Sequence, residues 1–107
     1  MLSKKNRVNT KEVKKIFTKS SFLNSPSFTF RYFKNNNKEI KISFIASKNI
    51  AKLAVKRNLL RRRGYSVLKK YIHEFPLGII GVFIFKKYQD DILTIENEIK
   101  NILNKIN

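Results

Sequence analysis

Four arginines fall within seven residues of a chain whose other basic residues are mostly lysines. Arg57, Arg61, Arg62 and Arg63 are four of only six arginines, against eighteen lysines. A guanidinium is a planar fork of donors that binds phosphate oxygens in pairs and stacks on bases, whereas an ammonium acts as a point charge. The residue type therefore predicts recognition of phosphate groups, with Asn58 as a neighbouring hydrogen-bonding side chain.

In a helix, Arg57 and Arg61 lie one turn apart. Asn58 and Arg62 form a second pair at the same spacing, and two adjacent rows of donors could span neighbouring phosphates of a folded RNA. The alternative is a solvated basic helix face, which is what most charge runs are. The formal net charge of +17 favours RNA, because charge of this size calls for a polyanion. An anionic membrane surface is the competing partner.

Side chains suited to catalysis are scarce. His73 is the single histidine, cysteine is absent, and no glycine-rich phosphate loop, metal-ligand cluster or nucleophile–base pair is visible. Asp90 and Asp91 lie at the start of a predicted helix, where carboxylates cap amides and oppose the macrodipole. We therefore expect no catalytic residue, metal or cofactor on the protein itself, and we expect any enzymatic chemistry to belong to a partner.

The basic cluster lies in a helix predicted over residues 52–73. Its apolar stripe is expected to face a sheet, and Gly64 on that stripe would let the helix approach closely, although glycine costs about 1 kcal/mol against alanine in a helix. The stripe consists of Leu53, Leu60, Gly64, Val67 and Tyr71, with Leu68 at its edge. The side chains expected nearly opposite are those of Asn58, Arg62, Tyr65 and Lys69.

Three stretches have the pattern of strands. Residues 28–33 and 39–46 alternate like half-buried strands, and the three asparagines at 35–37 predict a turn that makes them an antiparallel hairpin. Residues 78–86 are apolar on both faces, which predicts a strand in the centre of the sheet.

The N-terminal region is predicted to be a basic arm at residues 1–9 followed by a short helix at 10–19. Residues 20–27 are expected to form a loop, with an extra short strand near 21–25 as the alternative. The apolar face of the short helix consists of Val13, Ile16 and Phe17.

The C-terminal helix is predicted over residues 91–106, where isoleucine recurs at spacings of three and four. Charge is unevenly distributed along the chain. Ten bases and no acid lie between Glu39 and Glu74, whereas residues 86–107 hold four bases and four acids. The C-terminal helix is therefore expected to be scaffold, with the polyanion against the first and central helices.

The order of elements is αββαβα, which predicts an α+β fold, a two-layer α/β sandwich, in a single RNA-binding domain over residues 1–107. The N-terminus lacks the apolar segment of a signal peptide, and no run approaches the length of a membrane span. The absence of cysteine fits a reducing compartment. We expect a soluble cytoplasmic protein that does not bind membranes, because the sheet occupies the apolar helix face.

Residues 43–65, SFIASKNIAKLAVKRNLLRRRGY, resemble the most characteristic region of the bacterial ribonuclease P protein subunit. That family carries a Ser-Lys-Lys step at a strand end, then a helix with Arg-Asn-Arg, an apolar residue and Lys-Arg. Ser47 and Lys48 match the step, and the basic arm with a short helix ending in Phe17 is similar to the family's opening. The residues that match the helix are Ala54, Val55, Arg57, Asn58, Leu60, Arg61 and Arg62.

The sequence departs from the family pattern at five positions. Leu59 and Tyr65 stand where arginines are usual, and Asn49 replaces the second lysine of the step. Val13 replaces a common phenylalanine, and Arg31 falls near a common tyrosine. Individual RNA contacts are therefore expected to differ from those of the family.

The resemblance implies the non-catalytic subunit of an endoribonuclease, ribonuclease P, whose chemistry belongs to a catalytic RNA. That RNA removes the 5′ leader from precursor tRNA with bound Mg²⁺. The protein, monomeric within the ribonucleoprotein, sets its basic helix against the RNA and holds the single-stranded leader between sheet and first helix. A left-handed βαβ crossover is also implied, through the 52–73 helix, against the usual right-handed preference.

Two groups of contact residues follow. Contacts to the leader would combine stacking with backbone charge and so tolerate many sequences. The residues expected to bind the catalytic RNA are Ser47, Lys48, Lys52, Lys56, Arg57, Asn58, Arg61, Arg62, Arg63 and Tyr65. Those expected to bind the precursor-tRNA leader are Lys4, Lys5, Arg7, Lys11, Val13, Lys14, Phe17 and Arg31.

Two other functions fit a basic protein of this class. A free-standing RNA-binding or ribosomal protein would present the same basic face and have no role in tRNA cleavage. A nuclease in its own right would cleave precursor tRNA without an RNA partner, and the missing acid and histidine clusters argue against it.

Overall fold

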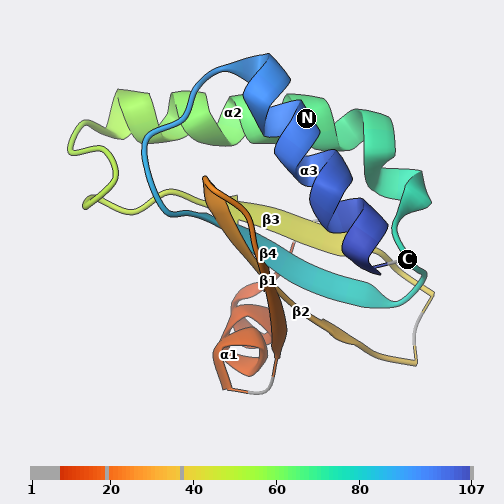
Figure 1. Cartoon of the computed structure of the whole chain (residues 1–107). Coiled ribbons are helices and arrows are strands. Elements are labelled where there is room, and N and C mark those ends of the chain that lie inside the picture. Colours follow the sequence, from red (N-terminus) through yellow and green to blue (C-terminus); the bar gives the residue numbers. More distant parts are fainter. Residues whose placement is uncertain (1–7, 19, 37, 107) are drawn as a thin grey trace.

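The computed structural model describes residues 8–18, 20–36 and 38–106. A four-stranded sheet carries two long helices on one face and a short helix on the other (Figure 1). The helices are α1 (Thr10–Thr18), α2 (Ala54–Tyr71) and α3 (Ile92–Ile106), and a short 3-10 helix, η2 (Ile72–Glu74), continues α2. The strands are β1 (Ser21–Asn24), β2 (Phe28–Lys34), β3 (Lys41–Ile45) and β4 (Ile79–Phe85).

The α+β class and the predicted order of elements are confirmed, with β1 as an addition. Residues 20–27 are therefore more than a loop, and the short-strand alternative near 21–25 is correct. β1 pairs with β2 in antiparallel register, with Phe22 opposite Arg31. β1 is therefore an edge strand of the sheet, next to β2.

The predicted hairpin of residues 28–33 with 39–46 is wrong. The strand order is β1–β2–β4–β3, in which β4 pairs antiparallel with β2 and parallel with β3. β4 is buried on both faces, whereas the side chains of β3 alternate between buried and half-buried. A strand that is apolar on both faces gains most from the sheet interior, so β4 separates its two neighbours. The prediction of a central strand at 78–86 is confirmed.

β3, α2 and β4 form a βαβ unit, because α2 connects two strands that are parallel neighbours. This is the connectivity that the resemblance implies, and its left-handedness stays a prediction. The unit brings the connections after β3 and after β4 to the same end of the molecule, where α2 begins (Figure 1).

Three phenylalanine rings stack across the sheet beneath the two long helices. Phe30, Phe83 and Phe44 share one row of register, and neighbouring ring centroids are 4.3 and 5.0 Å apart. A Cβ atom on Gly81 would lie 2.6 Å from the Phe30 ring, and one on Gly64 would lie 2.6 Å from the Phe44 ring. Both glycines therefore make room for rings, and the predicted close approach of the central helix to the sheet is confirmed.

The ends and faces of α3 agree with its sequence pattern. The Asp91 carboxylate accepts hydrogen bonds from the Thr94 hydroxyl (2.6 Å) and the Thr94 backbone N–H (2.9 Å). These bonds hold the pKa of Asp91 below its ordinary value. The predicted cap is thus present, and it satisfies an amide that the helix itself leaves without a partner.

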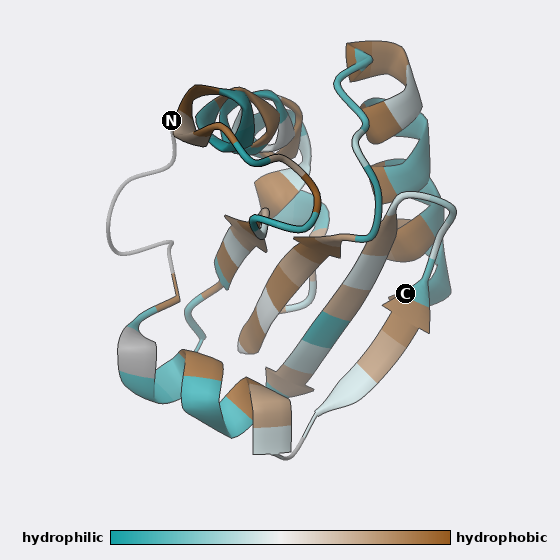
Figure 2. Ribbon diagram, turned by 90° about the vertical axis from the view of Figure 1, so that its left-hand side faces the viewer, coloured by the Kyte–Doolittle hydropathy of each residue, from teal (hydrophilic) through white to brown (hydrophobic). Residues whose placement is uncertain are grey.

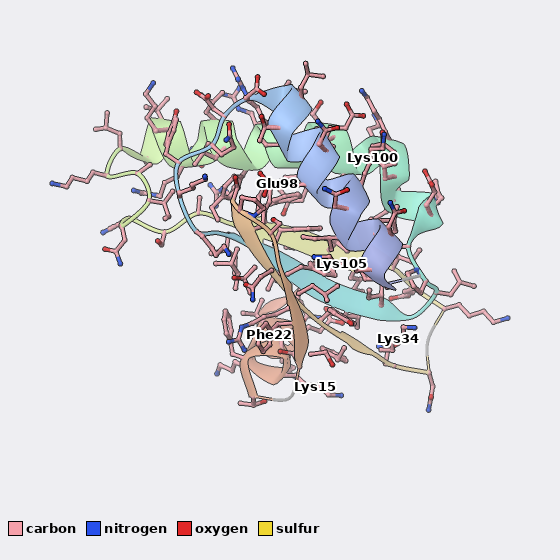
Figure 3. The ribbon with its side chains drawn as sticks, in the orientation of Figure 1. Lys15, Phe22, Lys34, Glu98, Lys100 and Lys105 are labelled. Atoms are coloured by element: carbon pink, nitrogen blue, oxygen red, sulfur yellow. The ribbon has the colours of Figure 1, made fainter. Side chains whose placement is uncertain are left out.

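Glu98, which Figure 3 labels beside α3, joins this helix to the turn between β1 and β2. Its buried carboxylate accepts hydrogen bonds from the Ser25 hydroxyl (2.7 Å), the Ser27 backbone N–H (2.7 Å) and the Ser27 hydroxyl (2.6 Å). A carboxylate is tolerated at such a site only when it is fully hydrogen-bonded. The contact fixes the β1–β2 hairpin against α3.

Candidate nucleic-acid interface

The N-terminal part of α2 extends beyond the hydrophobic core. The buried residues of α2 begin at Leu60, and none of residues 54–59 is buried. This end of the helix, with the turn that precedes it, presents seven of the ten predicted catalytic-RNA contacts in exposed positions. They are Ser47, Lys48, Lys52, Lys56, Asn58, Arg61 and Arg62. We call these seven residues the basic face.

Arg61 and Asn58 are in direct contact on this face. The Arg61 guanidinium donates a hydrogen bond to Asn58 Oδ1, so the two rows predicted from the sequence lie side by side. Arg62 is exposed and has no hydrogen bond or ion pair with any residue that the structure describes. Its fork of donors is thus free to bind two oxygens of a phosphate.

Arg57 and Arg63 are half-buried, and each uses donors inside the protein. Arg57 Nη1 donates to the carbonyl oxygens of Ala51 (2.9 Å) and Lys52 (2.8 Å). Arg63 Nη1 donates to the carbonyl oxygen of Asp90, between β4 and α3. A guanidinium has five N–H donors, so both residues keep donors for a phosphate. In the structure both arginines hold backbone carbonyls in place, a role that the sequence does not reveal.

The placement of Tyr65 on the exposed side of the helix is wrong. Its side chain is 8% exposed, its ring packs edge-on against Phe44 with centroids 5.1 Å apart, and its hydroxyl accepts a hydrogen bond from the Phe44 N–H (3.2 Å). The prediction that Leu53 belongs to the buried stripe is also wrong, because its side chain is 62% exposed. α2 packs on the sheet only from Leu60 onward, so Leu53 lies before the packed part of the helix and Tyr65 lies within it. The Tyr65 ring is therefore not available to stack on a base.

A second group of predicted contacts lies where α1 packs on the opposite face of the sheet. Arg31 of β2 lies between the rings of Phe17 on α1 and Phe22 on β1, 5.8 Å from each centroid. Both rings are about half exposed, and Figure 3 labels Phe22 beside α1. Cation–π contacts at exposed sites contribute about 0.5–1 kcal/mol each. Together the three side chains form an aromatic and cationic surface, which we call the Phe–Arg–Phe cluster.

α1 is anchored across several strands, and its apolar residues face the sheet (Figure 2). Ile16 is fully buried against β4. Glu12 forms an ion pair with Lys41 of β3 (3.3 Å), and the Val8 N–H donates to the Ser43 hydroxyl (2.9 Å). These contacts fix the position from which α1 presents Phe17.

The remaining predicted leader contacts differ in exposure. Lys11 and Lys14 are exposed on α1, and Val13 is half-buried. Lys4, Lys5 and Arg7 lie outside the described residues.

Phe22 is a candidate contact that the sequence did not predict. An expected loop at 20–27 gives it no partner, whereas pairing of β1 with β2 sets it opposite Arg31. The one signal is the adjacent pair Phe22–Leu23, which in a strand puts one apolar side chain on each face. Leu23 indeed packs against the main core, and this leaves Phe22 on the α1 side.

The described part of the chain meets neither the requirements of a metal site nor those of a membrane-spanning helix. Among residues 8–18, 20–36 and 38–106, no three His, Cys, Asp or Glu side chains gather into a group that could hold a metal ion. None of the helices in these ranges combines the length and the apolar character needed to cross a membrane.

Comparisons with known proteins agree with the resemblance. The family model described as Ribonuclease P matches residues 2–107. No protein with a curated description matches the sequence. The fold is similar to that of the RNase P protein from Thermotoga maritima, at 20% identity and a TM-score of 0.83, over 94% of this chain and 97% of that one.

The RNase P protein from Staphylococcus aureus is also similar in fold. One structure, at 18% identity, has a TM-score of 0.81 over 95% of this chain and 98% of that chain. Another, at 21% identity, has a TM-score of 0.75 over 99% and 92% of the two chains. At such identities the structural likeness establishes the fold, while the sequence match spans nearly the whole chain.

Proposed function

Because the chain belongs to the ribonuclease P protein family, we propose that it binds a catalytic ribonuclease P RNA and the 5′ leader of precursor tRNA. As a protein subunit of ribonuclease P it would assist the endonucleolytic removal of the leader. The cleavage chemistry would be supplied by the RNA with its bound Mg²⁺. The task of this chain's own residues is to bind and orient the two RNAs.

The observation that carries this proposal is the basic face. Its cationic and amide side chains lie on one end of α2 and the turn after β3, outside the core. Arginine and lysine side chains that neutralise phosphates release counterions, which makes binding favourable at low salt and weaker as salt rises. The net charge of +17 means that the chain has enough cationic side chains to neutralise several phosphates at once.

The Phe–Arg–Phe cluster suits the single-stranded leader. Half-exposed aromatic rings offer stacking to any base, and the Arg31 guanidinium between them offers charge to the backbone. A surface of this kind reads no particular sequence. It would therefore accept the varied leaders of different precursor tRNAs, while the basic face holds the structured RNA.

We propose further that the protein works in the cytoplasm, as a monomer within the ribonucleoprotein, and without a membrane partner. The apolar surface of α2 that could have met lipid is covered by the sheet from Leu60 onward.

The identity of the bound RNA tests the proposal against a free-standing RNA-binding protein. A tagged chain expressed in its own host is expected to co-purify with ribonuclease P RNA, enriched over ribosomal RNA at moderate salt. Sequencing of the recovered RNA measures this. Recovery of ribosomal RNA alone would support the free-standing alternative and contradict the proposal.

Removing the rings of the Phe–Arg–Phe cluster is expected to weaken binding of the leader specifically. Base–aromatic stacking contributes about 1–3 kcal/mol per base, so Phe17→Ala or Phe22→Ala in the reconstituted holoenzyme should raise the Kd for leader-bearing precursor tRNA by at least about fivefold. Affinity for leaderless tRNA should stay unchanged. Leu93→Ala is a matched control, because Leu93 is an exposed apolar side chain of α3, at 69%. Equal weakening toward both tRNAs would argue against a leader site here.

A further inference from the structure

An open pocket of about 480 Å³ lies at the end of the molecule where α2 begins. One wall is the segment 50–53 with Lys56 on the first turn of α2, and the other is formed by Tyr88 and Asp90 in the connection after β4. Both connections lie at the same end of the sheet (Figure 1). The volume is within the range of small-molecule sites, about 300–1,000 Å³.

Both walls of the pocket are fixed by arginines of α2. The Arg57 guanidinium holds the carbonyls of Ala51 and Lys52, and the Arg63 guanidinium holds the carbonyl of Asp90. The Tyr88 hydroxyl donates to Asp90 Oδ2 (3.3 Å), which orients the carboxylate. A site whose walls are held in place loses less conformational entropy when it binds a ligand.

The pocket combines three kinds of chemistry. The Tyr88 ring, 41% exposed, and the Leu53 side chain, 62% exposed, offer apolar surface to a flat ring. Lys52 and Lys56, both exposed, offer positive charge to a phosphate. The Asp90 carboxylate accepts hydrogen bonds and donates none when ionised, so it selects a ligand edge that presents donors.

We propose that this pocket binds one unpaired guanine nucleotide of an RNA partner. Among the four bases, only guanine presents two adjacent donors, N1–H and N2–H, and these match the two oxygens of a carboxylate. The base would stack on Tyr88, its Watson–Crick edge would face Asp90, and its phosphate would lie near Lys52 and Lys56. Unstacked bases held in this way are the usual source of sequence specificity in RNA recognition.

The position of the pocket favours RNA as the source of the nucleotide. Lys52 and Lys56 belong to the basic face, and the segment that precedes the pocket begins at Ser47, whose carbonyl accepts hydrogen bonds from the Ile50 and Ala51 N–H groups. An RNA on the basic face would thus reach the pocket without leaving the surface. The inference rests on the proposed function in this respect alone, since the pocket's chemistry is independent of it.

Titration of the free chain with GMP, AMP, UMP and inorganic phosphate tests the proposal by NMR. GMP should shift the Leu53 methyl and Tyr88 ring signals in the millimolar range, with weaker effects from AMP and UMP and none from phosphate. Tyr88→Ala should weaken GMP binding about tenfold, whereas the control Leu77→Ala, at another exposed apolar residue, should not. Asp90→Asn should remove the preference for GMP over AMP.

Three results would overturn the proposal: equal shifts with all three nucleotides, shifts of the same size with phosphate alone, or no shift at these two residues. Because the titration contains no RNA, its outcome is independent of assembly with ribonuclease P RNA. Failure of the pocket proposal and failure of the proposed function are therefore separate results.

Discussion

Replacing Arg61 and Arg62 together by alanine is expected to weaken binding to ribonuclease P RNA by about 30- to 150-fold at physiological salt. The figure corresponds to about 2–3 kcal/mol, or about 1–1.5 kcal/mol for each of two solvent-exposed contacts. Both side chains are exposed on the basic face, and neither takes part in the core. The fold should therefore be unaffected, and the loss should appear in RNA affinity measured by filter binding.

The matched control is the double variant Lys100→Ala, Lys105→Ala, which removes the same charge from exposed positions on α3. General electrostatic attraction predicts equal losses from both double variants, whereas a specific face predicts a loss within about threefold for the lysine pair. The salt dependence gives a second readout. Each lost phosphate contact should reduce the slope of log K against log salt by about 0.7–0.9. Equal losses and equal slopes for the two double variants would contradict the assignment of the basic face.

Gly64→Ala is expected to destabilise the protein, although alanine is the better helix former. Alanine gains about 1 kcal/mol of helix propensity, but its Cβ would lie 2.6 Å from two atoms of the Phe44 ring. That ring stacks on Phe83 and meets Tyr65 edge-on, so it has little freedom to move. Overpacking of a tight core costs about 1–3 kcal/mol. Because the ring is held on two sides, we expect a cost in the upper part of this range, about 2–3 kcal/mol, and hence a net loss of about 1–2 kcal/mol, measured by urea unfolding.

Ser66→Ala separates the two effects, because Ser66 is exposed on the same helix and its substitution changes propensity without a clash. It should leave stability unchanged or raise it slightly. In the Gly64→Ala background, Phe44→Leu should restore part of the loss by making room for the new methyl group. A Gly64→Ala variant at least as stable as the natural protein would refute close packing of α2 on Phe44.

The elements themselves could be predicted because their signals are local. Each signal spans only a few turns or residues. Examples are the apolar stripe from Leu60 to Tyr71, the strand at 79–85 that is apolar on both faces, and the cap at Asp91. The strand order could not be predicted in the same way. Pairing of β2 with β4 joins residues about fifty positions apart, and the asparagine-rich connection between β2 and β3 suggested a hairpin instead.

The candidate site could be predicted only in part, for a related reason. A helical wheel places residues by angle alone and does not show which part of the helix lies over the sheet. It therefore predicted a buried Leu53 and an exposed Tyr65, whereas Leu53 is exposed and Tyr65 is buried. Residue type predicted Arg57 and Arg63 as phosphate contacts and did not predict their bonds to backbone carbonyls. The Arg57 bonds depend on the conformation of the turn just before α2, and the Arg63 bond depends on how the distant connection after β4 meets α2. The predicted exposure of other residues of the basic face, such as Arg62, is confirmed, because they lie on the part of α2 that points away from the core.

The central claim is that this chain assists a catalytic RNA, and leader cleavage by that RNA at low Mg²⁺ tests it most directly. The RNA is the ribonuclease P RNA of the same organism, assayed with and without the purified chain. Protein cations that neutralise phosphates reduce the need for metal counterions. We therefore expect the chain to raise the cleavage rate strongly at low Mg²⁺ and much less at high Mg²⁺. Cleavage that is unaffected by the chain at every Mg²⁺ concentration, or cleavage by the chain without RNA, would contradict the account.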